Sequence, residues 1–411
     1  MGLPIKLFNS LFILIAMEGL FNTDTYSLKN MIGQLSYMLI NIIFIGIGIS
    51  SSTKKINYIS LSLLFFILIS VFSGIFNNSG LSNILEFFLR YGKIYFVCLT
   101  GYFFFNKLSI TDLYLPFSIL NILNFTLNTL FFLQIRFIPN KWIGTLDFAT
   151  GVLGDALYQC FFSLIVASFS FILMKRNKSK FSLKYIFFNL ITASIQIVWS
   201  NSFHLYLLIL FALLVTIFLI ENLLKSIKII IPIILIIFTF FRTIDSDFYQ
   251  YSIISLLNSS PKVSSYIDTF SGSYQNSFQK FIGVGPGKGG SYIAIKNQSY
   301  VAENYFSIYT YFTDMLRREG SITTLPNTAI TTLQSELGYL GLINYVIFIF
   351  MILKNLTSKI LVKEPLSKIS LFIILVYFLE NILADYLQHS IMPILTFLLA
   401  GIALGKKKND Y

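Results

Sequence analysis

Residues 56–76 read "INYISLSLLFFILISVFSGIF", an apolar run without a charged side chain. A helix needs about 20 mostly apolar residues to cross the hydrocarbon core of a bilayer. Further runs of this kind predict an all-α integral membrane protein with about 12 transmembrane helices. The expected spans lie near residues 4–21, 31–50, 56–76, 81–105, 112–133, 155–174, 183–199, 203–220, 228–241, 328–353, 369–386 and 390–405.

The composition agrees with a chain embedded in a membrane. Of the 411 residues, 55% are hydrophobic and 12% are charged, whereas about a quarter of the residues in soluble domains carry a charge. The first run contains Glu18 and no small-residue cleavage site follows it, so we expect it to be retained rather than removed as a signal peptide. Cys98 and Cys160 stand in apolar runs without a partner motif and indicate neither a disulfide nor a zinc site.

Lysine and arginine predict the orientation. They gather in alternate connections, at 51–55, 175–184, 225–228, 354–368 and in the C-terminal tail. Because cationic loops stay in the cytoplasm and the number of expected spans is even, both termini are predicted to be cytoplasmic. The net charge of +12 is then mainly a signature of topology, and it does not indicate a nucleic-acid partner.

Three regions follow from this topology. Residues 1–241 hold nine expected spans and a small outer loop near 134–154, and residues 327–411 hold three spans and a basic cytoplasmic tail. Residues 242–326 contain no spanning run and form a large extracytoplasmic loop, with short helices expected near 300–318. Long polar loops in compact proteins are usually functional, so we expect the activity in this loop.

Residues 281–292 of the large loop read "FIGVGPGKGGSY". A nucleotide-binding P-loop has glycine six positions before its lysine and Ser or Thr after it. Around Lys288 these positions hold Ile282 and Gly289, which argues against ATP binding. Two interpretations stay open: a turn cluster in which glycine supplies positive φ, or a nest of backbone N–H groups that binds an anion such as a lipid diphosphate.

Several cations lie on the predicted outer side, against the positive-inside trend. Each is explained either as a solvated or headgroup-contacting side chain or as part of a site for a phosphorylated substrate. Because arginine binds phosphate through two parallel hydrogen bonds, we rank the arginines of the large loop above its lysines. These outer cations are Arg136, Lys141, Arg242, Lys262, Lys280, Lys288, Lys296, Arg317 and Arg318.

Other polar residues give weaker signals. Glu86, Arg90 and Lys93 share one face of the fourth expected span, either as a structural ion pair or as the lining of a polar substrate path. Glu380 and Asp385 fall near the ends of expected spans, where an interfacial position explains them. The whole chain has two histidines, His204 and His389, and the large loop has one short acidic pair, Asp245 and Asp247. The sequence therefore gives little support for a metal site.

Residues 323–350 read "TTLPNTAITTLQSELGYLGLINYVIFIF". This segment resembles one in O-antigen ligases and Wzy-type O-antigen polymerases, where a His-Asn pair ends the large periplasmic loop and a Leu…Glu-Leu-Gly…Gly pattern begins the next span. Pro326 replaces the histidine, which weakens the ligase reading more than the polymerase reading. The matching residues are Asn327, Leu333, Glu336, Gly338 and Gly341.

Other segments fit the same family more loosely. Gly283, Gly285 and Gly287 stand in the place of its GxGxG segment, His204 lies near the position of its Ser-Arg pair, and Arg136 resembles part of its small outer loop. The resemblance implies a glycosyltransferase of the C superclass in the bacterial inner (cytoplasmic) membrane. It would polymerise undecaprenyl-diphosphate-linked repeat units into O-antigen or capsular-type polysaccharide, without a metal or cofactor.

The resemblance also assigns roles and partners. The donor and acceptor would be undecaprenyl-diphosphate-linked glycans within the lipid bilayer, and a chain-length regulator protein is compatible as a further partner. The expected catalytic residues are Arg242, Arg317 and Arg318 for the diphosphate, with Glu303, Asp314 and Glu319 as candidates for a base. The expected substrate-binding residues are Arg90, Arg136, His204, Lys262, Gly283, Gly285, Gly287, Lys288, Asn327 and Glu336.

Two alternatives stay open at this point. An O-antigen ligase would move the finished glycan to a different acceptor. A lipid-linked oligosaccharide flippase, or another transporter of about twelve spans, would share the span count and the cations. Flippases keep short loops on both sides, so the long segment 242–325 counts against that reading.

Overall fold

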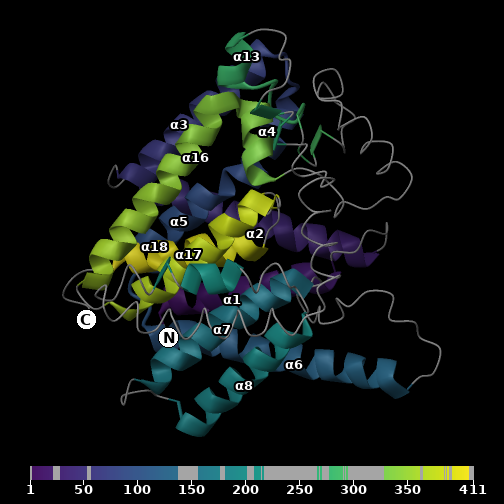
Figure 1. Cartoon of the computed structure of the whole chain (residues 1–411), viewed down its shortest axis with the longest axis vertical. Coiled ribbons are helices and arrows are strands. Elements are labelled where there is room, and N and C mark those ends of the chain that lie inside the picture. The colour runs from purple at the N-terminus through teal and green to yellow at the C-terminus, as the bar shows by residue number, and fades with distance from the viewer. Residues whose placement is uncertain are drawn as a thin grey trace, which may run out of the picture.

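Figure 1 shows the computed structural model of the chain. It describes residues 2–21, 28–52, 57–137, 156–175, 181–200, 208–213, 215–216, 266–267, 269–270, 277–289, 291, 293–294, 328–361, 364–383, 385, 387 and 391–406. All regular elements within these ranges are helices, as the sequence predicted. They are α1 (Leu3–Phe21), α2 (Leu28–Ser52), α3 (Tyr58–Phe76), α4 (Leu81–Tyr91), α5 (Lys93–Phe103), α6 (Ile110–Phe137), α7 (Ala156–Met174), α8 (Leu183–Trp199), α13 (Ser277–Ile282), α16 (Ala329–Leu361), α17 (Pro365–Leu383) and α18 (Ile391–Gly405).

Ten of the twelve predicted apolar runs coincide with these helices. Five helical segments are long and apolar enough to cross a membrane: Tyr58–Phe76, Ile110–Leu130, Leu157–Met174, Ala329–Ile360 and Pro365–Leu383. The chain is therefore a helical protein with several membrane-spanning candidates. The total of twelve spans stays a prediction, because the ninth run and most of the large loop lie outside the described residues.

Two predicted spans are not continuous straight helices. The run 81–105 is interrupted at Gly92, a turn residue that keeps helical dihedral angles (φ −75°, ψ −19°) between α4 and α5, and Lys93 is the first residue of α5. Glycine inside a helix is about 1 kcal/mol less favourable than alanine, which makes this position a natural break. Helix α16 bends at Gly338, whose φ of 65° and ψ of −167° are not helical. Figure 1 shows its two limbs diverging from a bend near α13.

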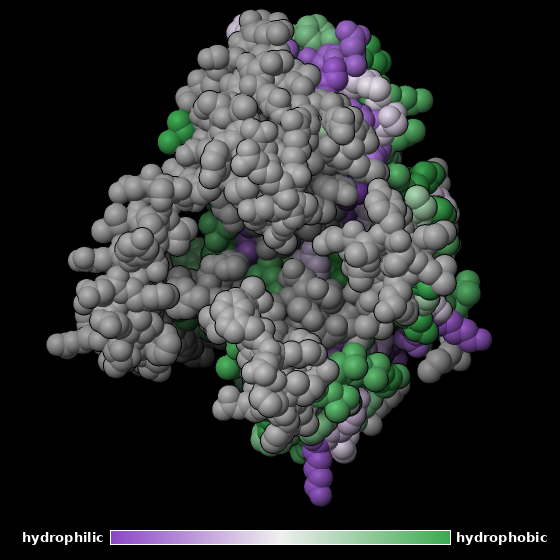
Figure 2. All heavy atoms as spheres, turned by 90° about the vertical axis from the view of Figure 1, so that its right-hand side faces the viewer, coloured by the Kyte–Doolittle hydropathy of each residue, from purple (hydrophilic) through white to green (hydrophobic). Residues whose placement is uncertain are grey.

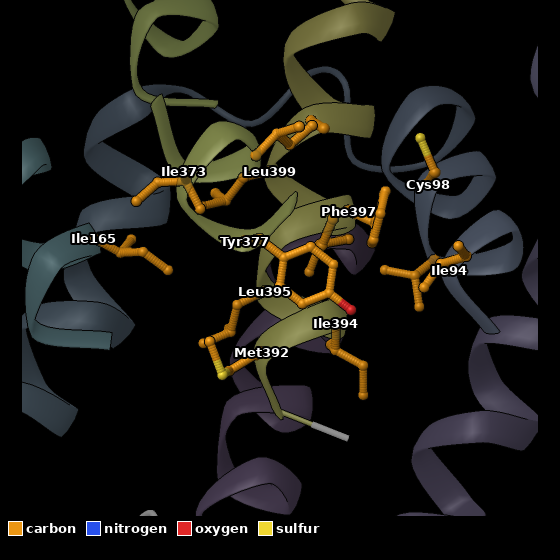
Figure 3. Close-up of a cluster of buried hydrophobic side chains, with 14 of the residues drawn as sticks. Ile94, Cys98, Ile165, Ile373, Tyr377, Met392, Ile394, Leu395, Phe397 and Leu399 are labelled. Atoms are coloured by element: carbon orange, nitrogen blue, oxygen red, sulfur yellow. The ribbon is translucent and has the colours of Figure 1, made fainter. Parts of the chain in front are cut away.

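The core is built around α18. Its residues from Ile391 to Leu404 are all buried, and Figure 3 shows this helix surrounded by apolar side chains of α5, α7 and α17. Glycines allow α5 and α18 to approach closely. A Cβ on Gly401 would come within 2.2 Å of the Cys98 carbonyl oxygen, and one on Gly101 within 2.6 Å of the Leu398 carbonyl oxygen. Small residues serve this purpose between membrane helices, where close packing replaces the hydrophobic drive of water.

Apolar side chains also cover much of the described surface. Figure 2 shows them reaching the surface along one edge of the molecule. On α3 they form a continuous exposed face, as expected for a helix that lies against lipid. The exposed residues of this face include Leu61, Leu64, Phe65, Leu68, Phe72 and Ile75.

Helices α6, α7 and α8 are joined by buried uncharged polar side chains. Gln196 Nε2 donates to Asn121 Oδ1 at 2.8 Å, and Gln159 Nε2 donates to Gln196 Oε1 at 2.7 Å. Asn128 also donates to Gln196 Oε1, at 3.3 Å. We call this group the amide cluster: Asn121, Asn128, Gln159, Asn189, Thr192 and Gln196.

Candidate functional site

The glycine-rich segment folds against the first limb of α16. Gly283, Gly285 and Gly287 all have positive φ, at 78°, 108° and 67°. This conformation is open to glycine and costly for residues with a Cβ. The alternation of glycine with other residues in "GVGPG" therefore sets a tight, specific path.

That path directs backbone N–H groups at the carboxylate of Glu336. Gly287 N donates to Oε2 at 2.6 Å, and Gly289 N and Ser291 N donate to Oε1 at 3.2 and 2.9 Å. The carboxylate is fully buried. We call Gly283, Gly285, Gly287, Gly289 and Ser291, together with Glu336, the glycine clasp.

The backbones of the two segments are in direct contact. Val284 N donates to Ser335 O at 2.8 Å, and Gly285 N donates to Glu336 O at 3.1 Å. A Cβ on Gly283 would lie 2.2 Å from the Glu336 carbonyl carbon, and a Cβ on Gly338 would lie 2.3 Å from the Phe281 carbonyl carbon. Glycine is thus required on both sides, and the bend at Gly338 belongs to the same structure.

Side chains of α3, of its C-terminal cap and of α4 donate hydrogen bonds to the backbone carbonyls of the clasp. Ser73 Oγ donates to Glu336 O at 3.1 Å, and Asn77 Nδ2 donates to Gly283 O at 3.1 Å. Asn83 Nδ2 donates to Gly287 O at 3.3 Å. Side chains from early in the chain therefore satisfy carbonyls of a loop about 200 residues later.

Lys288 lies at the edge of the clasp. Its Nζ donates to the carbonyl oxygen of Asn77 at 2.6 Å, and the side chain is only half-buried. Partial burial lowers the pKa of Lys288 from its ordinary value. The ammonium can donate two further hydrogen bonds, so an anion at this edge would find a cation already held in place.

A second buried carboxylate, Asp385, lies between α17 and α18. Its Oδ2 accepts hydrogen bonds from Tyr91 OH at 2.5 Å and from Thr332 Oγ1 at 2.8 Å. Its Oδ1 is buried, and the backbone N–H of Leu387 also favours the ionised carboxylate. Burial raises the pKa of Asp385 to about 6, although both hydroxyls and the charge of Lys93 favour its ionised form. We call Asp385, Tyr91 and Thr332 the Asp385 cluster.

The clasp and the Asp385 cluster are parts of one site. Thr332 and Glu336 are four residues apart on the first limb of α16, and therefore lie on the same helical face. Tyr91 ends α4 and reaches Asp385 beside this limb. The buried Lys93 begins α5, and its ammonium lies 5.6 Å from the ring centre of Tyr37 on α2. Arg90 is turned to a different partner, since its guanidinium binds Glu86 at 3.0 Å.

Six of the sixteen predicted site residues lie fully within the described residues. The structure brings together Gly283, Gly285, Gly287, Lys288 and Glu336. The positive φ values of the three glycines agree with the turn interpretation of this segment. The anion at the described N–H groups is the carboxylate of Glu336, not the lipid diphosphate of the second interpretation. Arg90 lies in its pair with Glu86, as one of the two predicted alternatives held.

The other predicted residues are not placed. Arg136 falls in α6, but its side chain lies outside the described residues. The remaining ones lie wholly outside, and their roles stay predictions: His204, Arg242, Lys262, Glu303, Asp314, Arg317, Arg318, Glu319 and Asn327.

Sequence reasoning missed the Asp385 cluster. Asp385 was expected at the membrane interface, yet its side chain is only 6% exposed because α4 and α16 cover it. The available signal was the pairing of Thr332 and Glu336 at a helical spacing, which marks a polar face in an otherwise apolar span.

These ionisable groups describe the kind of protein that holds the site. A helical membrane protein here holds two buried carboxylates, a buried lysine and a positioned surface lysine at one end of a bent helix. Within the described ranges, no group of three or more His, Cys, Asp or Glu residues is suited to hold a metal ion. Neither a protein-family model nor a curated protein matches the chain.

Proposed function

We propose that the protein is a polymerase of lipid-linked glycans. It transfers a growing glycan from its undecaprenyl-diphosphate carrier onto the next lipid-linked repeat unit, outside the cytoplasm. The new bond joins the anomeric carbon of the donor to an acceptor hydroxyl oxygen. The bond between that carbon and the diphosphate oxygen breaks, the carrier leaves as a diphosphate, and the hydroxyl proton goes to a base.

One observation carries this proposal. The resemblance to the polymerases rests on two segments about 50 residues apart, the glycine segment and the Glu-Leu-Gly segment, and these segments bind each other through the Glu336 carboxylate. Gly338 of the second segment has a positive φ and contacts Phe281 and Gly283 of the first. A shared structural role for these residue types supports the view that the motifs belong together.

The chemistry needs cations and a base. A departing diphosphate is stabilised by positive groups that strengthen their interaction as charge develops on its oxygen. Lys288 is the positioned candidate within the described residues, and Arg242, Arg317 and Arg318 remain proposed partners in the large loop. Asp385 joins Glu303, Asp314 and Glu319 as a candidate base, because it is a buried carboxylate beside the glycine clasp whose Oδ2 is already oriented by two hydroxyls.

The length profile of surface glycans in a deletion strain tests the function. Loss of a polymerase leaves glycans with a single repeat unit on the surface, because export and ligation continue. Loss of a flippase leaves none, and loss of a ligase leaves polymer on the lipid carrier. Absence of the single-unit species from the deletion strain would refute the proposal.

The arginines of the large loop give a second test. We expect Arg317→Ala and Arg318→Ala to abolish polymer while the protein still accumulates in the membrane. Immunoblotting of membranes measures accumulation, and gel separation of the glycans measures polymer length. Normal polymer length in both single variants and in the double variant would rule out the proposed role of these two residues, though not the function itself.

A further inference from the structure

Exposed aromatic side chains gather where α3 meets α13. Phe76, the last residue of α3, is 48% exposed, and Phe278 and Phe281 of α13 are 43% and 54% exposed. The rings of Phe76 and Phe278 pack edge to face with centroids 4.9 Å apart, and Phe72 contacts Phe278 at 6.5 Å. Phe72, Phe76 and Phe278 therefore form one contiguous apolar patch, and Phe281, one turn further along α13, packs edge to face on Tyr339 at 6.1 Å. A contiguous exposed patch of this kind marks an interaction surface.

The position of the patch along α3 identifies what covers it. Helix α3 is long and apolar enough to cross a membrane and presents an exposed apolar face along its length. It ends at Phe76 and is followed by Asn77, Asn78 and Ser79, so the boundary between hydrocarbon and headgroups lies at its last turn. Because Phe278 packs on that turn, α13 lies at the same boundary.

Charge on the same segment fits lipid headgroups. Lys280 lies in the last turn of α13, and the half-buried Lys288 follows at the edge of the glycine clasp. Lysine side chains at a membrane boundary place their stems along apolar surface and their ammonium groups among phosphates. A short segment with phenylalanines on one side and lysines nearby suits the interface between acyl chains and headgroups.

We infer that α13 and the last turn of α3 form an interfacial anchor that docks the glycine clasp on the membrane surface, with phospholipid as the partner. Phe76, Phe278 and Phe281 enter the acyl boundary, and Lys280 and Lys288 face the phosphates. The anchor and the clasp share backbone, since the Phe281 carbonyl packs on Gly338. The clasp is therefore held at headgroup level, whichever reaction the protein performs.

Quenching by brominated lipids tests the anchor in the full-length protein. Trp142 and Trp199 are first replaced by phenylalanine, and Phe278→Trp then supplies a single fluorophore. The protein is reconstituted into phosphatidylcholine vesicles that carry bromine either near the headgroup end or near the methyl end of the acyl chains. We expect a blue-shifted emission that loses more intensity with the shallow bromines than with the deep ones.

Two matched single-tryptophan variants calibrate the depth. Leu68→Trp, on the exposed face of α3 two turns before Phe76, should be quenched more by the deep bromines. Phe66→Trp, at a buried position of the same helix, should respond weakly to both lipids. Water-like emission from Phe278→Trp that neither lipid quenches, alongside normal quenching of Leu68→Trp, would overturn the inference.

The lysines are tested by charge reversal in the same background. Lys280→Glu with Lys288→Glu should reduce the shallow quenching of Phe278→Trp in vesicles that contain phosphatidylglycerol, because the acidic side chains are repelled by anionic headgroups. Unchanged quenching would refute the proposed contact of the lysines with phosphates.

Discussion

Two buried polar regions among the described residues differ in their chemistry. The amide cluster between α6, α7 and α8 contains only uncharged amides and a hydroxyl, which bind one another across helices. The site at the bend of α16 instead contains the carboxylates of Glu336 and Asp385 and the ammonium of Lys93, all buried. Both regions use hydrogen bonds in an apolar surrounding. No member of the amide cluster is ionisable, although the buried carboxylate of Glu380 lies near Cys160, the residue next to Gln159 of that cluster.

This difference indicates different roles for the two regions, helix assembly for one and chemistry for the other. Amides that bind across helices join membrane helices with modest energy, about 0.6 kcal/mol per interaction on average. Ionisable groups inside a membrane protein are costly to desolvate and are usually found where substrates, ions or protons are handled. We therefore propose that the amide cluster serves assembly and that the bend of α16 serves the proposed activity, and each of the following changes tests this proposal.

The largest effect is expected from Glu336→Ala. The change leaves three buried backbone N–H donors without an acceptor, at about 1–3 kcal/mol each, so stability falls by roughly 3 kcal/mol or more. Polymer is lost because the glycine clasp no longer holds Lys288. Thermal unfolding of the detergent-solubilised protein measures the first effect, and glycan profiles measure the second.

Glu86→Ala is the matched control for this change. It removes a carboxylate that binds Arg90 at 3.0 Å from a partly exposed position, where such pairs contribute about 0–1 kcal/mol. Equal losses of stability in the two variants would show that the hydrogen bonds to Glu336 contribute no more than a partly exposed ion pair.

Asp385→Asn should reduce activity without unfolding the protein. The amide keeps the shape of the carboxylate and can still accept from Tyr91 or Thr332, but it cannot take a proton. Positioned general bases contribute about 10²–10⁴-fold, so the transfer rate should fall by at least about 100-fold. The rate is measured with purified lipid-linked repeat units.

Tyr91→Phe distinguishes the effect of the Asp385 carboxylate itself from the effect of its hydrogen-bond partners. This variant removes one hydrogen bond to Oδ2 and leaves the carboxylate in place, so its rate should lie well above that of Asp385→Asn. If Asp385→Asn polymerises at the normal rate, the base belongs elsewhere, with Glu303, Asp314 or Glu319 as the remaining candidates.

These residues also show what the sequence could predict. Apolar runs located the helices, because the length of a spanning helix is set by the bilayer and is visible without any tertiary contact. Gly283, Gly287 and Glu336 were each marked as functional, but their mutual binding depends on a contact between residues about 50 positions apart. Sequence spacing carries no information on such a contact, so the sequence left a turn cluster and a nest for an external anion as alternatives, and it did not predict that the chain supplies its own anion.

The break at Gly92 and the burial of Asp385 were also not predicted, because both depend on tertiary contacts. One glycine in an apolar run is compatible with a continuous helix, and only packing decides whether the helix divides there. A carboxylate near the end of a span reads as interfacial until α4 and α16 are seen to cover it. The residue types were informative, whereas their environments had to come from the fold.

A pH profile probes the same carboxylate with a smaller effect. With the pKa of Asp385 raised to about 6 by burial, acidification through pH 6 protonates the proposed base, and the rate near pH 5 should be about a tenth of the plateau. The charge of Lys93 and the hydrogen bonds from Tyr91 and Thr332 oppose this protonation, whereas burial favours it. Asp385→Asn should abolish this inflection in the profile.

Stability should move in the opposite direction over this window. Because the folded pKa lies above the ordinary value of 3.8, the folded state binds more protons than the unfolded state between about pH 4 and pH 6. The contribution of Asp385 therefore favours folding as the pH falls. A loss of rate near pH 5 that coincides with unfolding would not report on Asp385, so melting curves must accompany the rates.

The smallest effect is expected from Gln196→Leu in the amide cluster. The change removes the donor to Asn121 and the acceptor of Gln159, but it replaces an uncharged side chain by an apolar one of similar size. Stability should fall by about 1 kcal/mol, a factor of about five in the folding equilibrium, while the rate per folded molecule is unchanged. Ser194→Ala on the exposed face of α8 is the control, since its hydroxyl bonds only within its own helix. A Gln196→Leu variant that folds normally but no longer makes polymer would place function in the amide cluster, and the distinction between buried charge and buried amides would fail as a guide to the site.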